Sequence, residues 1–352
     1  MGRHWPPGTA SSVRKLTIID IAREANVSIK TVSRVINRER GVGKDTRARV
    51  EDIIKTHNFK PNASARSLPG SRSYLIGLLI RTLANHYYLN GLQAGVMRAC
   101  RRHGYHAILE TTEDYAASGR DAFVKRLAGS QYDGLVVAPP VCDDPAILSI
   151  LEEMDIPLVR ISPTTQFERA PYVYMNDQRA AYEIVEHLWD LGHRHIAFLG
   201  FKETGASKER YAGYSQFFRD KGLAPPYPQF ELDQTTSASA LSAGEALVCR
   251  ADRPTAVFAA TDFLALGLMA AASKHGLSIP GDLSLVGFDD SPGTESVWPP
   301  LTTVHQPIET IAETAVDLLV AGLGGQLADR TRFARVLDFK VVIRGSTAPP
   351  RP

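Results

Sequence analysis

Polar and basic side chains near the N-terminus recur at helical spacing around an apolar stripe. In a helix predicted over residues 29–37 this stripe faces inward and leaves the other side chains exposed. On the exposed face, Arg34 can donate two parallel hydrogen bonds to guanine O6 and N7, Lys30 can do similar work, and Ile29 can touch a thymine methyl group. Four further residues are placed to contact phosphates, which fixes register without reading bases: Thr17, Ser28, Thr31 and Asn37. The pattern predicts a surface that reads double-stranded DNA.

Charge is distributed unevenly along the 352 residues, whose net charge is only +2. Residues 1–68 hold 14 Lys and Arg against 6 Asp and Glu, which gives +8, and the remaining 284 residues hold 26 against 32, which gives −6. A basic head on a mildly acidic body is typical of a nucleic-acid-binding module joined to a second functional part.

Candidate catalytic signals do not form complete sites. His187, His193 and His195 are close in sequence, but no carboxylate or cysteine completes a metal-ligand set with them. The glycine-rich stretch 322–325 lacks the lysine and the helix of a phosphate-binding loop. Asp289 and the aspartate after it would point apart on extended backbone, which disfavours a paired acid and base. We therefore expect no catalytic residue, no metal and no cofactor, and a protein that is not an enzyme.

Three short helices position the exposed polar residues of the head. The first begins at Thr17, whose hydroxyl can cap it, and ends at Asn26, a residue type that tolerates positive φ. Ser28 caps the second helix, 29–37, and a third helix spans about 45–57. Two short helices joined by a tight turn, with polar residues exposed on the second, predict a helix-turn-helix whose second helix enters the major groove.

From residue 74 onward, apolar runs alternate with helical stretches. Strands are predicted at 75–80, 106–110, 134–138, 158–161, 195–200, 255–260, 283–287 and 340–343. Runs without polar alternation are typical of a parallel sheet covered by helices on both faces, and a reset near residue 176 indicates two similar lobes. The predicted fold class is therefore a small all-α head and an α/β body of two doubly wound lobes, with a ligand beyond the carboxyl ends of the strands.

The segment Thr17–Leu68, with TVSRVIN and, after a third helix, KPNASARSL, resembles the DNA-binding head of the lactose-repressor/galactose-repressor family. The resemblance implies that Ile29, Lys30 and Arg34 read bases. It also implies a minor-groove hinge helix formed by Asn62, Ala63, Ala65 and Leu68, in which the leucine wedges into a central base step. The chain departs from the pattern at three positions: Asn26 replaces a turn glycine, Gly43 replaces a serine cap, and Pro69 follows the wedge leucine.

The resemblance extends over the body, through YLIGLLI, YDGLVVAPP, HLWDLGHRHIAFLG, ERYAGY, PTAVFAATDFLALG, LSLVGFDD and PPLTTVHQP. The family's body is similar to periplasmic sugar-binding proteins, with two lobes, three crossovers and a ligand between the lobes. Carried over by motif, the effector-binding residues are Tyr87, Tyr88, Arg210, Thr261, Asp262, Asp289 and Gln306. Ser162 stands where the family often has an aspartate, which would remove one contact to a ligand hydroxyl.

Several of these residues have a simpler structural role that is equally compatible with the sequence. Asp262 follows a strand and is as well suited to capping the next helix as to binding a ligand. Tyr87 and Tyr88 can form a flat wall for a sugar ring or a half-buried aromatic pair at a helix start. Arg210 carries five donors in a rigid fork, and Asp289 lies just past a strand, so both are suited to ligand hydroxyls.

Composition narrows the class of protein further. A hydrophobic content of 44% excludes a disordered chain, and no uncharged apolar run reaches about 18 residues, so we expect no membrane segment. The residues near the N-terminus include no apolar segment of the kind that an export signal requires, so we expect no such signal. Three dispersed cysteines, Cys100, Cys142 and Cys249, favour reduced thiols and a cytoplasmic protein. The resemblance to the repressor family implies in addition that this protein is bacterial and associated with the nucleoid.

The expected domain organisation has six parts. They are a disordered N-terminal extension (1–15), a helix-turn-helix domain (16–60), a hinge helix and linker (61–73), an N-terminal lobe (74–175 plus 304–332), a C-terminal lobe (176–303 plus 333–346) and a tail (347–352). The tail carries no heptad repeat, so no coiled-coil tetramer is expected.

The sequence as a whole predicts a transcription regulator, a repressor, that acts as a homodimer on a pseudo-palindromic operator. A small molecule between the lobes, a mono- or disaccharide, would control its operator affinity. The alternative is a cytosolic sugar-binding or sugar-modifying protein with an incidental basic head.

Overall fold

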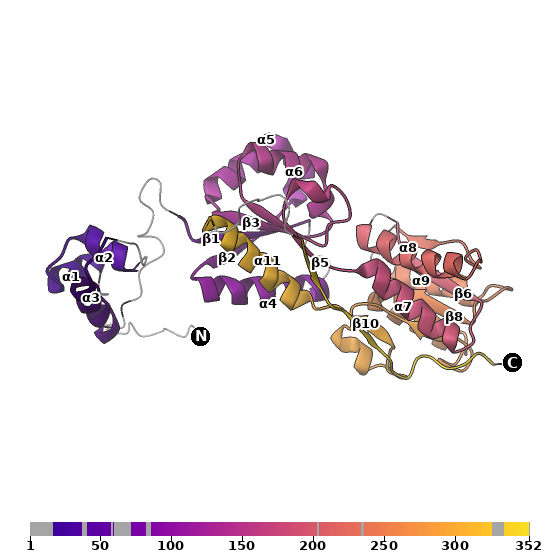
Figure 1. Cartoon of the computed structure of the whole chain (residues 1–352). Coiled ribbons are helices and arrows are strands. Elements are labelled where there is room, and N and C mark those ends of the chain that lie inside the picture. Colours follow the sequence, from indigo (N-terminus) through magenta and orange to yellow (C-terminus); the bar gives the residue numbers. More distant parts are fainter. Residues whose placement is uncertain are drawn as a thin grey trace, which may run out of the picture. The chain divides into compact units, whose positions relative to one another are not determined.

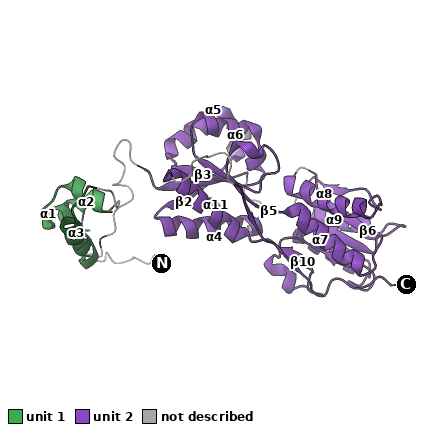
Figure 2. Cartoon of the chain, viewed as in Figure 1, with its two compact units in different colours: residues 1–73 green, residues 74–352 purple. Residues whose placement is uncertain are grey.

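The computed structural model describes residues 17–36, 41–57, 59, 72–81, 86–202, 204–233, 236–325 and 334–351. Residues 1–73 and 74–352 form two compact units (Figure 2). The predicted N-terminal extension, the phosphate contact Asn37 and the hinge residues Asn62, Ala63, Ala65 and Leu68 lie outside the described residues.

The described residues of the head form three helices, α1 (Ile18–Glu24), α2 (Ile29–Ile36) and α3 (Lys44–Thr56) (Figure 1). Thr17 caps α1 in a capping box: its hydroxyl accepts from the Asp20 amide, and the Asp20 carboxylate accepts from the Thr17 amide at 2.9 Å. The Ser28 Oγ caps α2 by accepting from the Thr31 amide at 3.1 Å. Both predicted caps are thus confirmed, and each satisfies an amide that a helix start leaves without a backbone partner.

The turn between α1 and α2 is tight because Asn26 adopts a φ of 50°, the left-handed conformation that its residue type tolerates. Gly43 precedes α3 without a side-chain capping bond. The three helices close over a small core that includes Ile21, Val32 and Val50, each fully buried.

The first lobe of the body is built on a six-stranded parallel sheet in the order β11-β5-β4-β3-β1-β2. Its strands are β1 (Leu75–Ile80), β2 (His106–Thr111), β3 (Gly134–Val137), β4 (Leu158–Ile161), β5 (Tyr172–Met175) and β11 (Ala334–Leu337). Its helices are α4 (His86–His103), α5 (Glu113–Ser130), α6 (Pro145–Glu153) and α11 (Ile308–Leu323), with short 3-10 turns η2 (Val141–Asp143) and η3 (Phe167–Arg169).

The second lobe has a four-stranded parallel sheet in the order β7-β6-β8-β9. Its strands are β6 (Ile196–Phe201), β7 (Phe230–Leu232), β8 (Ala256–Ala259) and β9 (Ser284–Val286). Its helices are α7 (Asp177–Asp190), α8 (Gly205–Asp220), α9 (Ser237–Val248) and α10 (Asp262–Lys274), with the 3-10 turn η4 (Pro292–Glu295).

The sequence assigned residues 333–346 to the second lobe, but the structure places part of this segment in the first lobe. Residues 334–337, expected in the second lobe, form β11 and pair with β5 of the first lobe. The strand expected at 340–343 is β12 (Lys340–Val342), which pairs antiparallel with β10 (Thr303–His305) in a separate two-stranded sheet. The sequence did not reveal this because β11 is short and partly polar, and pairing between strands distant in the chain leaves no local signal.

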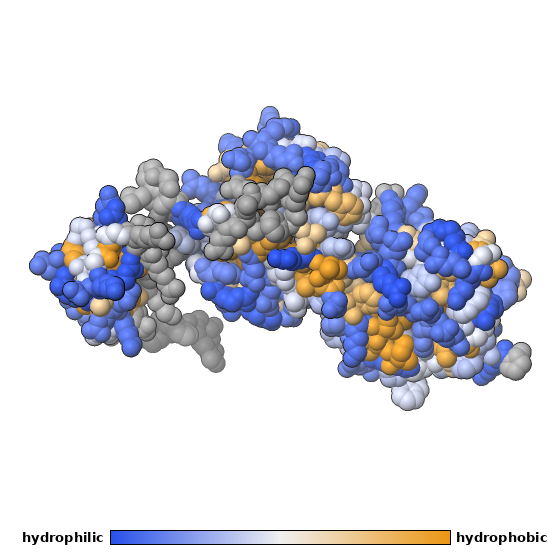
Figure 3. Space-filling model, in the orientation of Figure 1, coloured by the Kyte–Doolittle hydropathy of each residue, from blue (hydrophilic) through white to orange (hydrophobic). Residues whose placement is uncertain are grey.

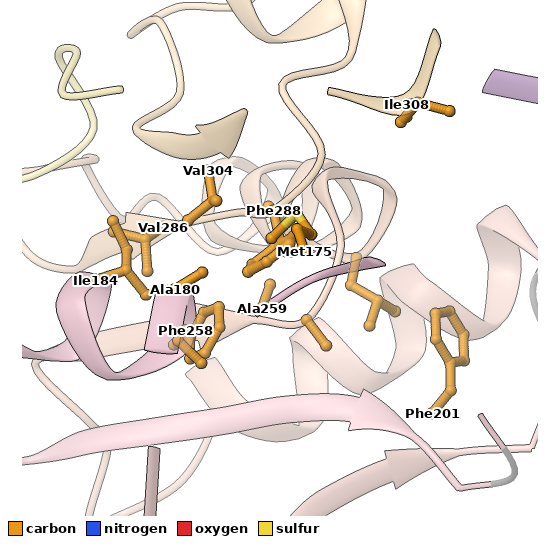
Figure 4. Close-up of a cluster of buried hydrophobic side chains, with 14 of the residues drawn as sticks. Met175, Ala180, Ile184, Phe201, Phe258, Ala259, Val286, Phe288, Val304 and Ile308 are labelled. Carbon is orange, nitrogen blue, oxygen red and sulfur yellow. The ribbon is translucent and has the colours of Figure 1, made fainter. Parts of the chain in front are cut away.

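A continuous hydrophobic core extends through both lobes. Phe258 of β8 and Phe288 lie with centroids 6.4 Å apart, and Figure 4 shows them in one cluster with Met175, where β5 ends. In the first lobe, α4 packs against α11, and Arg98 and Arg102 of α4 pair with acidic residues of α11. The side of the first lobe formed by α4 is largely hydrophilic in Figure 3.

The last residues of the chain are docked on the second lobe. The Ser346 hydroxyl donates to the carbonyl of Leu285 at 2.6 Å and accepts from the Thr302 amide at 2.8 Å. The imidazole of His193, which is 1% exposed, makes a 2.9 Å hydrogen bond to the carbonyl of Ala348. The segment expected to be a tail is therefore anchored to the lobe up to at least Ala348.

Candidate nucleic-acid interface and ligand site

The outer face of α2 carries the predicted base-reading residues. Val32 and Val35 are buried in the head, whereas Ile29 is 48% exposed and Lys30 is exposed. Arg34 is half-buried. It lies one turn after Lys30 on the same face of the helix, because residues four apart are neighbours on a helix surface. An exposed isoleucine beside two basic side chains provides one apolar and two hydrogen-bonding groups for base edges.

The predicted phosphate contacts lie at the beginnings of the first two helices. The Thr17 hydroxyl donates to the Asp20 carboxylate at 2.7 Å, and the hydroxyls of Ser28 and Thr31 lie 2.9 Å apart in a mutual hydrogen bond. These side chains therefore organise the helix starts, where amides also attract anions.

In the body, Arg210 lies at the centre of the predicted ligand site and is only 4% exposed. Its Nε donates to the Asp177 carboxylate at 2.8 Å, and its Nη1 donates to the carbonyl of Ala260, the residue after β8, at 2.5 Å. The guanidinium carbon lies 3.6 Å from the ring centroid of Phe288. Arg210 is thus held by an ion pair, a backbone carbonyl and an aromatic face at once.

Asp289 lies beside this arginine, with its Oδ1 3.7 Å from Arg210 Nη1. The side-chain amide of Gln306, itself buried, donates to the same oxygen at 2.5 Å. Burial is the largest cause that raises the pKa of Asp289 to about 7, and Arg210 acts in the opposite direction. Asp289 also has a φ of 123°, a strained conformation of the kind that clusters at functional sites.

Asp262 has a structural role that the sequence left open. It is 1% exposed; its carboxylate accepts from the Thr303 hydroxyl at 2.6 Å and from the Ser291 amide at 2.7 Å. Thr261, not Asp262, caps α10, since its hydroxyl accepts from the Leu264 amide at 3.3 Å. Burial raises the pKa of Asp262 to about 6. Asp262 ties α10 to β10 behind the site.

The two tyrosines bring the first lobe into the site. The Tyr87 hydroxyl donates to the carbonyl of Asp290 in the second lobe at 3.2 Å, and burial raises the pKa of Tyr87 to about 12. Burial raises the pKa of Tyr88, and the nearby Arg210 and Ser162 side chains act in the opposite direction. Ser162 has a φ of 44° where β4 ends. Residues from four separate segments of the first and second lobes therefore converge.

Other residues of the site carried no distinct sequence signal. Asp177 and Phe288 hold Arg210 from 33 and 78 positions away, so no spacing rule reveals them. A Cβ atom on Gly205, the first residue of α8, would meet Thr164 of the first lobe, with 2.7 Å to its Cγ2. This close approach joins the lobes on one side of the site and requires a residue without a side chain.

Among the described residues, no group of three or more His, Cys, Asp or Glu side chains could hold a metal ion. In that same part of the chain, no helix is both long enough and apolar enough to span a membrane.

Two family models match the chain. Residues 17–62 match the bacterial regulatory proteins of the lacI family, and residues 185–347 match the periplasmic binding protein-like domain. The HTH-type transcriptional repressor PurR of Vibrio campbellii is 33% identical over 343 residues, covering 94% of this chain and 98% of the relative. Catabolite control protein A of Priestia megaterium is 30% identical, covering 94% and 99%.

Solved structures that are similar to this chain are also those of transcription regulators. The lac repressor dimer bound to operator and the anti-inducer ONPF is 28% identical with a TM-score of 0.77, covering 95% of this chain and 100% of that one. The complex of the transcriptional regulator CelR with cellobiose is 27% identical with a TM-score of 0.67, covering 94% and 99%.

A helix-turn-helix head joined to a two-lobed binding body defines a DNA-binding transcription regulator with a ligand-binding domain. The chain belongs to the lacI family of bacterial regulatory proteins.

Proposed function

We propose that this protein is a repressor that binds a pseudo-palindromic operator as a homodimer. Binding of a mono- or disaccharide between the lobes would raise or lower its affinity for the operator. The observation that carries the proposal is the pairing, in one chain, of an exposed recognition face on α2 with residues of two lobes that converge on Arg210. Acting on chromosomal DNA, the protein would work in the cytoplasm at the nucleoid.

On the DNA side, Ile29, Lys30 and Arg34 would contact base edges in the major groove, one head per half-site. Thr17, Ser28, Thr31 and Asn37 would contact phosphates. Asn62, Ala63, Ala65 and Leu68 would form the minor-groove hinge, with the leucine as wedge. The solved lac repressor is a dimer bound to operator, which supports the dimeric arrangement.

On the ligand side, Arg210 and Asp289 would hydrogen-bond ligand hydroxyls, with Gln306 orienting the carboxylate. Tyr87 and Tyr88 would supply the apolar wall, and Ser162 and Thr261 would line the edge. Asp262 would support the site through Thr303 without touching the ligand. A sugar is favoured by this mixture of aromatic rings and hydroxyl-binding groups, and CelR in complex with cellobiose is similar to this chain.

The DNA assignment is tested by a gel shift on the DNA upstream of the protein's own gene. Arg34→Ala should remove a bidentate base contact worth about 1–3 kcal/mol, weakening specific binding roughly 5- to 150-fold and relaxing base preference. Arg23→Ala, which removes an exposed arginine from α1, is the matched control and should change operator affinity little. Intact specificity in Arg34→Ala would exclude Arg34 as a base-reading residue.

The ligand assignment is tested by a thermal-shift screen of mono- and disaccharides, with purines as the competing class. A ligand that binds the folded state raises the melting temperature by mass action. Each ligand found is then added to the gel shift, where it should change operator affinity. Stabilisation by purines alone would overturn the sugar assignment and leave the DNA-binding function intact.

A further inference from the structure

We propose that Asp290 is a positioning residue that links the ligand site to two strands crossing between the lobes, and so fixes the angle between the lobes. The ligand itself is assigned to the neighbouring Asp289. This inference rests on the proposed function, because it specifies how a change at the ligand site would be passed on within the repressor.

Two strands carry the chain between the lobes and pair with each other. β10 leads from the second lobe to α11 of the first, and β12 leads back from β11 to the residues docked on the second lobe. They pair antiparallel, with His305 at the end of β10 opposite Lys340 at the start of β12. A change in the angle between the lobes therefore has to bend or shift these crossover strands.

The carboxylate of Asp290 contacts both crossover segments. Its Oδ2 lies 3.0 Å from Nδ1 of His305, the last residue of β10, and its Oδ1 accepts from Nη2 of Arg344, two residues after β12, at 2.7 Å. The side chains of Asp290 and Arg344 are 19% and 13% exposed, so this pair is screened less than an ion pair on the surface. One carboxylate therefore joins the end of β10 to the segment that follows β12.

The backbone of Asp290 connects these strands to the first lobe and to the ligand site. Its carbonyl accepts from the Tyr87 hydroxyl of α4 at 3.2 Å. The preceding residue, Asp289, donates its amide to the Val304 carbonyl of β10 at 2.9 Å and accepts from Gln306 through its carboxylate. Asp289 and Asp290 have φ values of 123° and 56°, conformations that the surrounding contacts must enforce. A movement of Asp289 towards a ligand would therefore displace Asp290 as well.

A purely local role for this carboxylate would be to hold Arg344 on the second lobe. Arg344 has further partners there, because its Nη1 donates to the Leu301 carbonyl at 3.0 Å and its Nη2 lies 3.0 Å from the Glu295 carboxylate. These contacts anchor Arg344 without Asp290. Loss of the Asp290 charge should therefore leave the second lobe folded and loosen the link to the crossover strands.

The test measures the distance between the lobes in the full-length protein by pulsed electron paramagnetic resonance. One spin label is placed on Cys249, the exposed native cysteine of the second lobe, and one on Asp121→Cys, an exposed position on α5 of the first lobe. Cys100 and Cys142 are buried and should stay unlabelled. Labelled subunits are diluted into unlabelled ones, so that only distances within one subunit are recorded.

Asp290→Asn keeps the shape of the side chain and removes its charge, so it should broaden the distance distribution by roughly 2-fold or more. Asp290→Glu restores the charge and should recover part of the original width. The matched control is Asp282→Asn, which breaks another aspartate–arginine pair of the second lobe, with Arg351 at 2.6 Å, before β9 rather than after it. This control should leave the width unchanged, and an unchanged width in Asp290→Asn would overturn the proposal.

A second variant tests one of the two links alone. His305→Ala removes a half-exposed side chain and breaks the contact between Asp290 and β10 while Arg344 stays paired. The distribution should broaden in this variant too, by less than in Asp290→Asn. A distribution as narrow as that of the wild type would exclude the link through β10.

Operator DNA tests whether the link also transmits a change. Because coupling between two sites is reciprocal, DNA from upstream of the protein's own gene should shift the mean distance in the wild type, and Asp290→Asn should lose most of this shift while still binding the DNA. An equal shift in both proteins, or none in the wild type, would mean that Asp290 does not carry the coupling. Failure of the wild type to bind this DNA would instead contradict the proposed function, and the widths without DNA would still decide the role of Asp290.

Discussion

At the scale of single residues, Arg210 shows how one buried charge organises the ligand site. A lysine at this position would keep the charge but could not hold Asp177, the Ala260 carbonyl and the face of Phe288 together, because its ammonium is a single point. We expect Arg210→Lys to weaken effector binding at least 10-fold, measured by titration calorimetry, while operator affinity without effector stays within about 2-fold. The control is Arg179→Lys, an exposed arginine of α7. Unchanged effector affinity in Arg210→Lys would contradict its role.

The two buried aspartates of the second lobe predict a pH dependence of stability. The pKa values of Asp289 and Asp262 are raised to about 7 and about 6, so the folded state favours their protonated forms. Their stabilising contribution is complete at pH values below the ordinary aspartate pKa and is lost as pH rises through about 6–7. In Asp289→Asn the residue stays neutral, so the melting temperature of the variant minus that of the wild type should increase by several degrees from pH 5 to pH 8. A difference independent of pH would refute the raised pKa of Asp289.

The residue scale also shows where sequence reasoning reaches its limit. Arg210, Asp289 and Gln306 follow from motifs, and the structure brings them together. Asp177 and Phe288 contact Arg210 only through tertiary packing, which no local spacing encodes. For Asp262 the sequence offered two roles, binding a ligand or capping the next helix, and neither describes its observed contacts. Its hydrogen-bond partners, Thr303 and Ser291, are 41 and 29 positions away in the sequence.

At the scale of elements, strands with uninterrupted apolar runs were predictable, whereas β7 and β11, which have exposed residues, were not. The apolar runs in β1, β3, β6 and β8 are buried on both faces of their sheets, so each strand can be recognised in the sequence as a continuous apolar segment. β7 and β11 have exposed residues and three or four positions, too few to show a period. The helix starts of the head were predictable because capping is a local interaction between residues three apart.

The start of α8 provides a test of how the two lobes meet. Because a Cβ at Gly205 would meet Thr164 of the first lobe, Gly205→Ala should push the lobes apart on that side and weaken effector binding at least 10-fold, measured by calorimetry. Gly129→Ala in α5, where a Cβ would meet nothing within 4 Å, is the matched control and should leave effector affinity unchanged. A second change, Thr164→Gly, should restore part of the affinity lost in Gly205→Ala. Equal affinities of Gly205→Ala and wild type would show that this contact does not support the site.

At the scale of the whole molecule, effector and operator must influence each other equally. If saturating effector changes the operator dissociation constant by some factor, operator DNA changes the effector dissociation constant by the same factor, since both describe one coupling free energy. The chain enters the body at Tyr74, which has a φ of 60° and whose amide donates to the Asp133 carboxylate at 2.9 Å. Tyr74 is also tied to β2, because its carbonyl accepts from the His106 amide at 2.8 Å.

A rigid entry point is what would allow a change between the lobes to reach the head, because a loose one would absorb the movement. We therefore expect Asp133→Ala, which removes the partner of the Tyr74 amide, to reduce the coupling factor several-fold. Effector affinity without DNA and operator affinity without effector should each stay within about 2-fold of wild type. The measurement is fluorescence anisotropy of labelled operator with and without saturating effector, and Asp121→Ala, an exposed position on α5, is the control. A coupling factor equal to that of wild type would mean that the signal reaches the head by a route that does not depend on how Tyr74 is held.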